Sequence, residues 1–404
     1  MRHIVYTLLL LFVLPFTTQA QTQYLYRVVD GDTVRYTYTP FQIDSTTLPP
    51  QKQGFLRRVV DYFGRSTEDR TFEKGIDITF AGGPSYSNTT KLGLAVLAAG
   101  LYRIDRTDSI TSPSDISIYA NVTTSGFYSF GVMGNTIFSQ AKRKMDYDVY
   151  FSSAPRDVWG IGYHAGSHNA KSDLVEKSYM VYARFLQRIL PNTYIGPMLD
   201  FEHVQGRKFN DVSLSYIAGQ KHAYTATGLG LAMEFDSRDF IPNPYRGLYL
   251  SVEGLWYARG LGNCSKSLYR LHFTANSYHR LWRGGLLATD LHGEFNSEGT
   301  PWTMLARLGG TERMRGYYLG RYTDNNLLTA QIELRQHIWR RIGCVVWGGA
   351  GTVFSEREPF AWRHALPNYG IGLRWELKKR VNVRLDYGFG RSTSGFLLEI
   401  NEAF

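Results

Sequence analysis

Three arginines lie within nine positions of one glycine-rich, polar segment, residues 308–326, which reads LGGTERMRGYYLGRYTDNN; they are Arg313, Arg315 and Arg321. A guanidinium group stays charged and presents a rigid fork of donors that matches a carboxylate. On composition alone, the simplest interpretation is an exposed loop whose arginines face solvent, although a surface loop needs no such cluster. The purpose of the segment therefore depends on where the neighbouring strands place it.

Motifs for bond-breaking chemistry are missing from the sequence. Neither a G-x-S-x-G nucleophile elbow nor an H-E-x-x-H zinc motif occurs. His164 and His168 could together chelate a metal, but a solvated loop is the simpler interpretation. We therefore predict no catalytic residue, no metal and no cofactor. An enzyme built into a barrel is the least favoured alternative. It stays open because the catalytic groups of such an enzyme carry no strong local sequence motif.

The first 74 residues differ from the rest. Residues 1–20 combine a short basic start, an apolar run and a small-residue cleavage site, as in a secretory signal peptide. Residues 21–74 are expected to form a periplasmic linker with one short amphipathic helix in GFLRRVVDYFGR. After the signal, no apolar run is long enough for a membrane helix. An exported chain with a formal charge of +10 is expected to meet anionic lipid or acidic ligands, not nucleic acid.

From about residue 75 onward, apolar and polar residues alternate with a period of two, which indicates strands with one apolar and one polar face. In the segment 327–339, Ile332 and Leu334 share one face, whereas Glu333 and Arg335 share the other. The apolar faces would meet in the core of a soluble sandwich, but would face lipid in a membrane barrel. Strands of roughly 10–13 residues that carry charges in mid-strand favour the barrel, because a wet lumen accepts those charges.

Counting strands back from residue 404 gives 16, the first near 91–104 and the last near 394–404. We therefore predict an all-β fold, a 16-stranded antiparallel transmembrane barrel within residues 75–404, preceded by a short periplasmic extension. The segment 75–83 also has the pattern of a strand and would be a seventeenth, so we expect it either to merge with the first strand or to lie in the barrel mouth. Short turns at one end and long loops at the other are typical of outer-membrane barrels.

Segments 144–153 and 156–163 are taken as two strands joined by a turn at 154–155, and the turn at 124–125 is placed among the short ones. On this topology Cys264 lies at the long-loop end and Cys344 at the short-turn end. They would be about 30 Å apart, beyond the reach of a disulfide, so we predict two free thiols.

The arginine-rich segment joins the eleventh and twelfth strands and contains MRGYY, residues 314–318. This resembles the [V/I]-R-G-[F/Y] motif of BamA/TamA-type outer-membrane assembly and translocation barrels, the bacterial surface antigen family. The segment FDSRDFIPNPYRGLYLSVEG is similar to the D-[ST]-R-D turn of that family, through Asp236, Arg238 and Asp239. QIELR in the twelfth strand and a terminal aromatic, Phe404, also match, so the resemblance covers about residues 75–404.

The resemblance implies roles for individual residues. In the family this loop folds back into the barrel, so Arg315, Gly316 and Tyr317 are expected in the lumen, with Glu333 as the partner of the arginine. Removing one partner of a buried ion pair costs about 3–5 kcal/mol, so the pairing should fix the loop. Gly349 stands where the family has an aspartate in its thirteenth strand. The loop is therefore expected to be held less firmly, or by Asp386 instead.

The resemblance also implies a function. The first and last barrel strands, here near 91–104 and 394–404, should meet in a weak seam to which a client strand can add. We expect a monomeric barrel, integral to the bacterial outer membrane, that assists insertion or translocation of proteins or lipid. Its expected partners are outer-membrane lipid and, as clients or helpers, unfolded outer-membrane proteins or accessory lipoproteins. Residues 21–74 are too few for a POTRA domain, which favours the alternative of a channel-forming or structural barrel without insertase activity.

Overall fold

The computed structural model describes two units of the chain, Met1–Val60 and Asp61–Phe404. The described residues are 24–29, 32–37, 71–73, 75–87, 91–108, 111, 113–217, 219–241, 243–378 and 381–404. In the first unit, β1 (Tyr24–Val29) and β2 (Asp32–Thr37) form an antiparallel hairpin that was not predicted from the sequence. The short helix predicted in the same linker lies outside the described residues.

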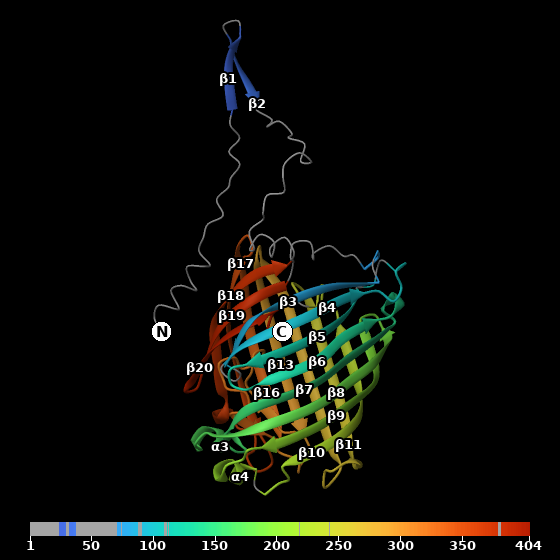
Figure 1. Ribbon diagram of the computed structural model, residues 1–404, viewed down its shortest axis with the longest axis vertical. Helices are drawn as coiled ribbons and strands as arrows, with labels where there is room; N and C mark the ends of the chain where they lie inside the picture. Colours follow the sequence, from blue (N-terminus) through green and yellow to red (C-terminus); the bar gives the residue numbers. More distant parts are fainter. Residues whose placement is uncertain are drawn as a thin grey trace. The chain divides into compact units, whose positions relative to one another are not determined.

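The second unit is a closed antiparallel barrel of 16 strands (Figure 1), so the predicted fold is confirmed. No helix in the described part of the chain has the length and apolar character needed to span a bilayer. Each barrel strand pairs with the next barrel strand along the chain, and the last barrel strand closes the ring against the first. The strands are β3 (Ile76–Ser87), β4 (Lys91–Tyr102), β5 (Ser114–Thr123), β6 (Tyr128–Ile137), β7 (Arg143–Val158), β8 (Ser172–Leu190), β9 (Thr193–Arg207), β10 (Ala223–Asp236), β11 (Gly247–Gly262), β12 (Leu268–Trp282), β13 (Gly285–Asn296), β16 (Asn326–Trp339), β17 (Ile342–Phe354), β18 (Leu366–Lys378), β19 (Val381–Gly390) and β20 (Thr393–Ile400).

The barrel wall is apolar outside and polar inside, as the alternation predicted. On β16, Ile332 is 47% exposed, whereas the neighbouring Glu333 is completely buried. On β18, Ile371 faces outward and Arg374 is buried, and on β19 Asp386 is buried in the same way. Outward isoleucines would be an aggregation hazard in water, but they are the favourable surface against hydrocarbon.

The three longest connections between barrel strands lie at the same end of the barrel. We call the end with connections 159–171, 208–222, 297–325 and 355–365 the loop end, and the end with 191–192, 237–246, 283–284 and 340–341 the turn end. The loop end carries α3 (Tyr163–His168), α4 (Asp211–Tyr216) and the 3-10 turn η2 (Trp362–His364), and the turn end carries η1 (Ser139–Ala141). Cys264 follows β11 at the loop end and Cys344 lies near the start of β17 at the turn end. Both are free thiols, as predicted.

Two details of the predicted strand count are wrong, and their effects on the total cancel. Residues 76–87 are the first barrel strand and not an extra one, because β3 pairs with β4 along its whole length. Residues 143–158 form one strand, so 154–155 is not a turn. The pairing of β7 with β6 ends at Ser153, and Pro155 lies beyond it, where an edge position accepts a proline. As a result, the turn at 124–125 lies at the loop end.

The barrel closes between its last strand, β20, and its first strand, β3. Among the described residues these two strands share one registered pair, Leu398 with Tyr86, whereas β19 and β20 share eight. The first seam strand is therefore 76–87, and the predicted 91–104 is wrong. The last strand is also shorter than predicted, because β20 ends at Ile400 and Asn401 has a positive φ of 70°. Residues 401–404, which we call the tail, turn into the lumen, so Phe404 is not a strand residue.

Candidate functional site in the lumen

Connection 297–325, which we call the lumenal loop, folds back into the barrel between β13 and β16. Within it, β14 (Ala306–Leu308) and β15 (Tyr322–Asp324) pair as a small antiparallel sheet. Apolar side chains of the lumenal loop, α3 and the wall form one buried cluster, which stabilises the loop inside the barrel by removing apolar surface from water. Its members are Tyr163, Ala306, Leu308, Met314, Tyr317, Tyr322, Leu327, Val353 and Leu366.

The tip of the lumenal loop presses its backbone against β19. Met314 and Gly316 have positive φ angles of 51° and 101°, which turn the chain sharply at this point. A Cβ atom on Gly316 would lie 2.5 Å from the carbonyl oxygen of Gly388, and one on Gly388 would collide with the carbonyl oxygen of Arg315. This close approach therefore requires glycine on both sides.

The tip is also bonded to the hairpin that β19 and β20 form. The Tyr317 hydroxyl donates to the carbonyl oxygen of Pro367 at 2.8 Å and accepts from the backbone N–H of Arg391 at 2.7 Å. The Thr393 hydroxyl donates to the carbonyl oxygen of Gly316 at 2.9 Å. Because Thr393 begins the seam strand, the lumenal loop directly contacts the strand that closes the barrel.

Arg315 is completely buried between two carboxylates of the wall. Its Nη1 lies 2.7 Å from Oδ2 of Asp386, and its Nη2 pairs with Oε2 of Glu333. The guanidinium carbon lies 3.7 Å from the ring centroid of Trp347, in the geometry of a cation–π contact. The geometry thus brings together the arginine and both acids that the resemblance pointed to, and it excludes a solvent-exposed Arg315.

Further arginines converge on the same two acids and form, with them and Arg315, what we call the arginine cluster. Arg335 Nε lies 2.7 Å from Glu333, while Arg374 Nη1 and Arg384 Nη1 lie 2.5 Å and 3.1 Å from Asp386. Each acid is shared by two or more guanidinium groups, which a buried charge needs in place of water. Sequence reasoning did not assign these three arginines a role, although the alternation placed Arg335 on the same face as Glu333.

The lumenal loop has a second anchor, although position 349 is a glycine and not an acid. A Cβ atom at position 349 would lie 2.7 Å from Cβ of Gln331 and closer still to the carbonyl oxygen of Ala330, so an acidic side chain has no room there. Arg313 instead makes a bidentate contact with Asp290 on β13, with both hydrogen bonds at 2.9 Å. This second anchor was not found from the sequence, because no motif joins the two residues.

The other predicted motif forms a separate structure in turn 237–246. Arg238 makes a bidentate contact with Asp236, at 2.9 Å and 2.7 Å, and its guanidinium carbon lies 4.2 Å from the ring centroid of Tyr249. Asp239 accepts a hydrogen bond from the backbone N–H of Tyr245 at 2.9 Å. These contacts all lie within the β10–β11 hairpin, so they stabilise its turn and are not part of the arginine cluster.

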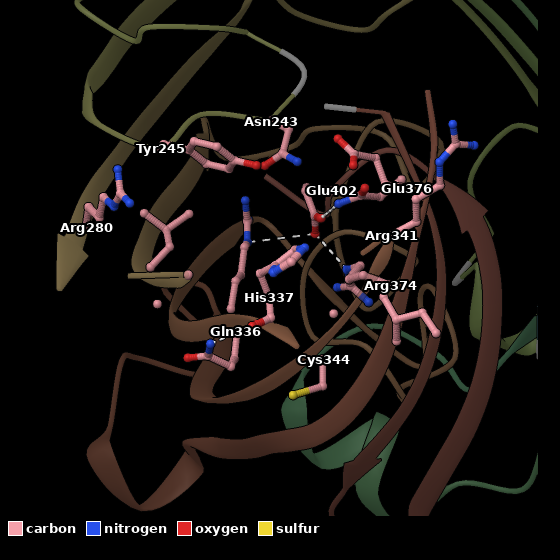
Figure 2. A pocket seen from close by; sticks show the side chains of 17 residues that line it. Asn243, Tyr245, Arg280, Gln336, His337, Arg341, Cys344, Arg374, Glu376 and Glu402 are labelled. Carbon is pink, nitrogen blue, oxygen red and sulfur yellow. Dashed lines mark hydrogen bonds and ion pairs between the residues drawn. The ribbon is translucent and has the colours of Figure 1, made fainter. Parts of the chain in front are cut away.

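At the turn end, the arginine cluster borders a cavity of about 280 Å³ (Figure 2). Arg335 and Arg374 line it together with Glu402 of the tail. One carboxylate oxygen of Glu402 lies 2.8 Å from Nε of Arg374 and 3.8 Å from Nε of Arg335. Burial acts to raise the pKa of Glu402, but the two arginines outweigh it and hold that pKa below its usual value. The tail therefore brings a stable negative charge to the cluster.

Comparison with known proteins gives one family and several solved structures. The Omp85 superfamily domain matches residues 114–404. BamA from Haemophilus ducreyi lacking POTRA domains 1–3 is similar at 12% identity and a TM-score of 0.54, over 81% of this chain and 69% of that one. CdiB from Acinetobacter baumannii (11%, TM-score 0.54, 81% and 60%) and CdiB from Escherichia coli (10%, TM-score 0.55, 82% and 68%) are similar too. At these identities the likeness concerns the fold, and no curated protein matches the chain.

Proposed function

Because this chain belongs to the Omp85 superfamily and its barrel is integral to the outer membrane, we propose that it assists insertion or translocation of polypeptides, or of lipid, at that membrane. The observation that supports the proposal is the seam, where the described residues of β20 and β3 share a single registered pair. Strands that meet so sparsely present edges to which an incoming strand can add by backbone hydrogen bonding. The loop end then faces the outside and the turn end faces the periplasm.

Strand β3 has a composition that favours opening on its side of the seam. Gly82, Gly83 and Pro84 follow one another in its middle. Glycine weakens a strand interior, and proline removes one ladder donor. On the other side of the seam, β20 is held by eight registered pairs with β19 and by the lumenal loop through Thr393. The seam is therefore the place where the barrel separates at least cost.

Arg315 has a positioning role in this proposal. The arginine cluster fixes the tip of the lumenal loop against β19, and the tip in turn holds the start of β20. Membrane lipid, unfolded outer-membrane proteins and accessory lipoproteins are the partners that this function calls for. No bond-breaking chemistry is part of it.

A channel-forming or structural barrel is the alternative function. The lumenal loop argues against a wide pore, because its buried cluster and its ion pairs with the wall occupy the lumen. Large, stable single-channel conductance would favour the alternative.

The proposal is tested by the folding rate of an unfolded outer-membrane protein into liposomes that contain this protein or lack it. We expect faster folding with the protein present, and loss of most of that acceleration in Arg315→Ala. The absence of acceleration in vesicles where the barrel is folded, shown by its heat-dependent gel mobility, would refute insertase activity of the barrel itself.

A further inference from the structure

The tail crosses the inner wall of the barrel where β20 would otherwise continue. The backbone N–H of Asn401 donates to the carbonyl oxygen of Asn382 at 2.7 Å, and the Asn382 side chain donates to Glu402 at 2.6 Å. Arg335 donates to the backbone oxygen of Phe404 at 2.8 Å. The Phe404 ring packs against a buried cluster on β12 and β13, made of Tyr278, Leu286 and Ala288. The tail is thus held by β19 and by strands beyond it, on the side away from the seam.

The register of the seam defines a second place for the same residues. Antiparallel pairing that continues from Leu398 and Tyr86 puts Glu402 opposite Gly82 and Ala403 opposite Ala81. The tail would then extend β20 along β3 and add registered pairs to the single one now present. The lumenal position and this seam position exclude each other, because the same four residues occupy both.

Side-chain chemistry distinguishes the two positions. Side chains alternate along a strand, so in the seam position Glu402 would share the outward face of Phe396, which is 39% exposed and whose ring lies 6.0 Å from that of Tyr86. A carboxylate on the lipid side is unfavourable there. In the lumenal position the same carboxylate lies 2.8 Å from Arg374. Glu402 therefore favours the lumen on both counts.

We propose that the tail moves between the lumenal position and the seam position, and that the ion pairs of Glu402 with Arg374 and Arg335 hold it in the lumen and keep the seam sparsely paired. This inference rests on the seam invoked in the proposed function, and it makes Glu402 a positioning residue for seam opening. Since the arginine cluster holds both the lumenal loop and the tail, the two ends of β20 are fixed through the same group of side chains.

The test is disulfide trapping in the full chain with Cys264→Ser and Cys344→Ser. Ala81→Cys with Ala403→Cys reports the seam position, because directly opposed residues of antiparallel strands lie within disulfide reach. Tyr86→Cys with Leu398→Cys is the reference pair, in register in both positions. We expect the 81–403 disulfide to form slowly in this background and about tenfold faster with Glu402→Gln, the effect of one charge-assisted hydrogen bond.

Glu253→Gln is the matched control, because it removes a lumenal carboxylate paired with Arg184 at 3.1 Å on another part of the wall. Equal 81–403 rates in Glu402→Gln and Glu253→Gln, with the 86–398 disulfide still forming, would overturn the proposal. If Glu402→Gln does not fold, Phe404→Ala replaces it, because it loosens the lumenal position without changing charge and should also speed the 81–403 disulfide. No client is present in this experiment, so its result is separate from that of the liposome folding test.

Discussion

The carbonyl oxygen of Gly388 on β19 lies only 2.5 Å from the position that a Cβ atom on Gly316 would take. Backbone therefore packs on backbone at the tip of the lumenal loop. An ion pair tolerates small shifts of its side chains, whereas this backbone contact leaves no room for an added methyl group. The contact between Gly316 and Gly388 sets the position along the barrel axis at which Arg315 enters the space between Glu333 and Asp386.

Gly388→Ala should consequently displace the loop tip, because the added methyl group collides with the carbonyl oxygen of Arg315. We expect a loss of about 1–3 kcal/mol in the free energy of unfolding, typical of overpacking, and faster proteolysis of the lumenal loop in the folded barrel. Unfolding by urea in detergent and limited proteolysis measure the two effects. Gly254→Ala is the control, since a Cβ atom on Gly254 meets nothing within 4 Å. Equal behaviour of the two variants would contradict the close contact.

Arg315→Ala and Glu333→Ala should lower the free energy of unfolding by similar amounts, about 3–5 kcal/mol each, because each removes one partner of the same buried ion pair. The double variant should add little to either single one, because both changes break the same pair. Urea unfolding of the four proteins gives the coupling energy. Asp290→Ala breaks the separate pair with Arg313 and should add fully to Arg315→Ala. Additive losses for Arg315 and Glu333 would show that they are not partners.

The two thiols should respond differently to maleimide and to pH. In whole cells an impermeant maleimide should reach Cys264 before Cys344, because the proposed topology places the loop end outside; the reverse order would invert that topology. In detergent the order should change, since Cys264 is only 9% exposed and Cys344 lines the cavity at the turn end.

Burial, with a smaller effect of Glu202, raises the pKa of the Cys264 thiol. Its reactive thiolate is therefore scarce near neutral pH, and its labelling rate should go on rising with pH above the usual thiol range.

Alternation along single strands was enough to predict the polarity of the wall, because a period of two is a local property. It placed Glu333 and Arg335 together on the polar face before any partner was known. The pairing of Arg313 with Asp290 and the packing of Phe404 could not be found in this way, since they depend on which strands are neighbours and how far each is shifted. The local pattern also gave a wrong prediction at Pro155, because in the sequence a proline at a strand edge looks the same as a proline in a turn.

Adding bulk at position 349 should weaken the barrel, even though the family resemblance seen in the sequence implies an acid there. A Cβ atom on Gly349 would lie 2.7 Å from Cβ of Gln331, and the backbone of β16 at Ala330 blocks the other direction. Gly349→Ala should therefore cost about 1–3 kcal/mol in the free energy of unfolding, and Gly349→Asp more, because its carboxylate would be buried without a designed partner. Gly348→Ala is the adjacent control, since a Cβ atom on Gly348 meets nothing within 4 Å. A gain in stability from Gly349→Asp, measured by urea unfolding, would mean that β16 and β17 can separate enough to admit the acid, and that Asp290 and Asp386 do not replace it.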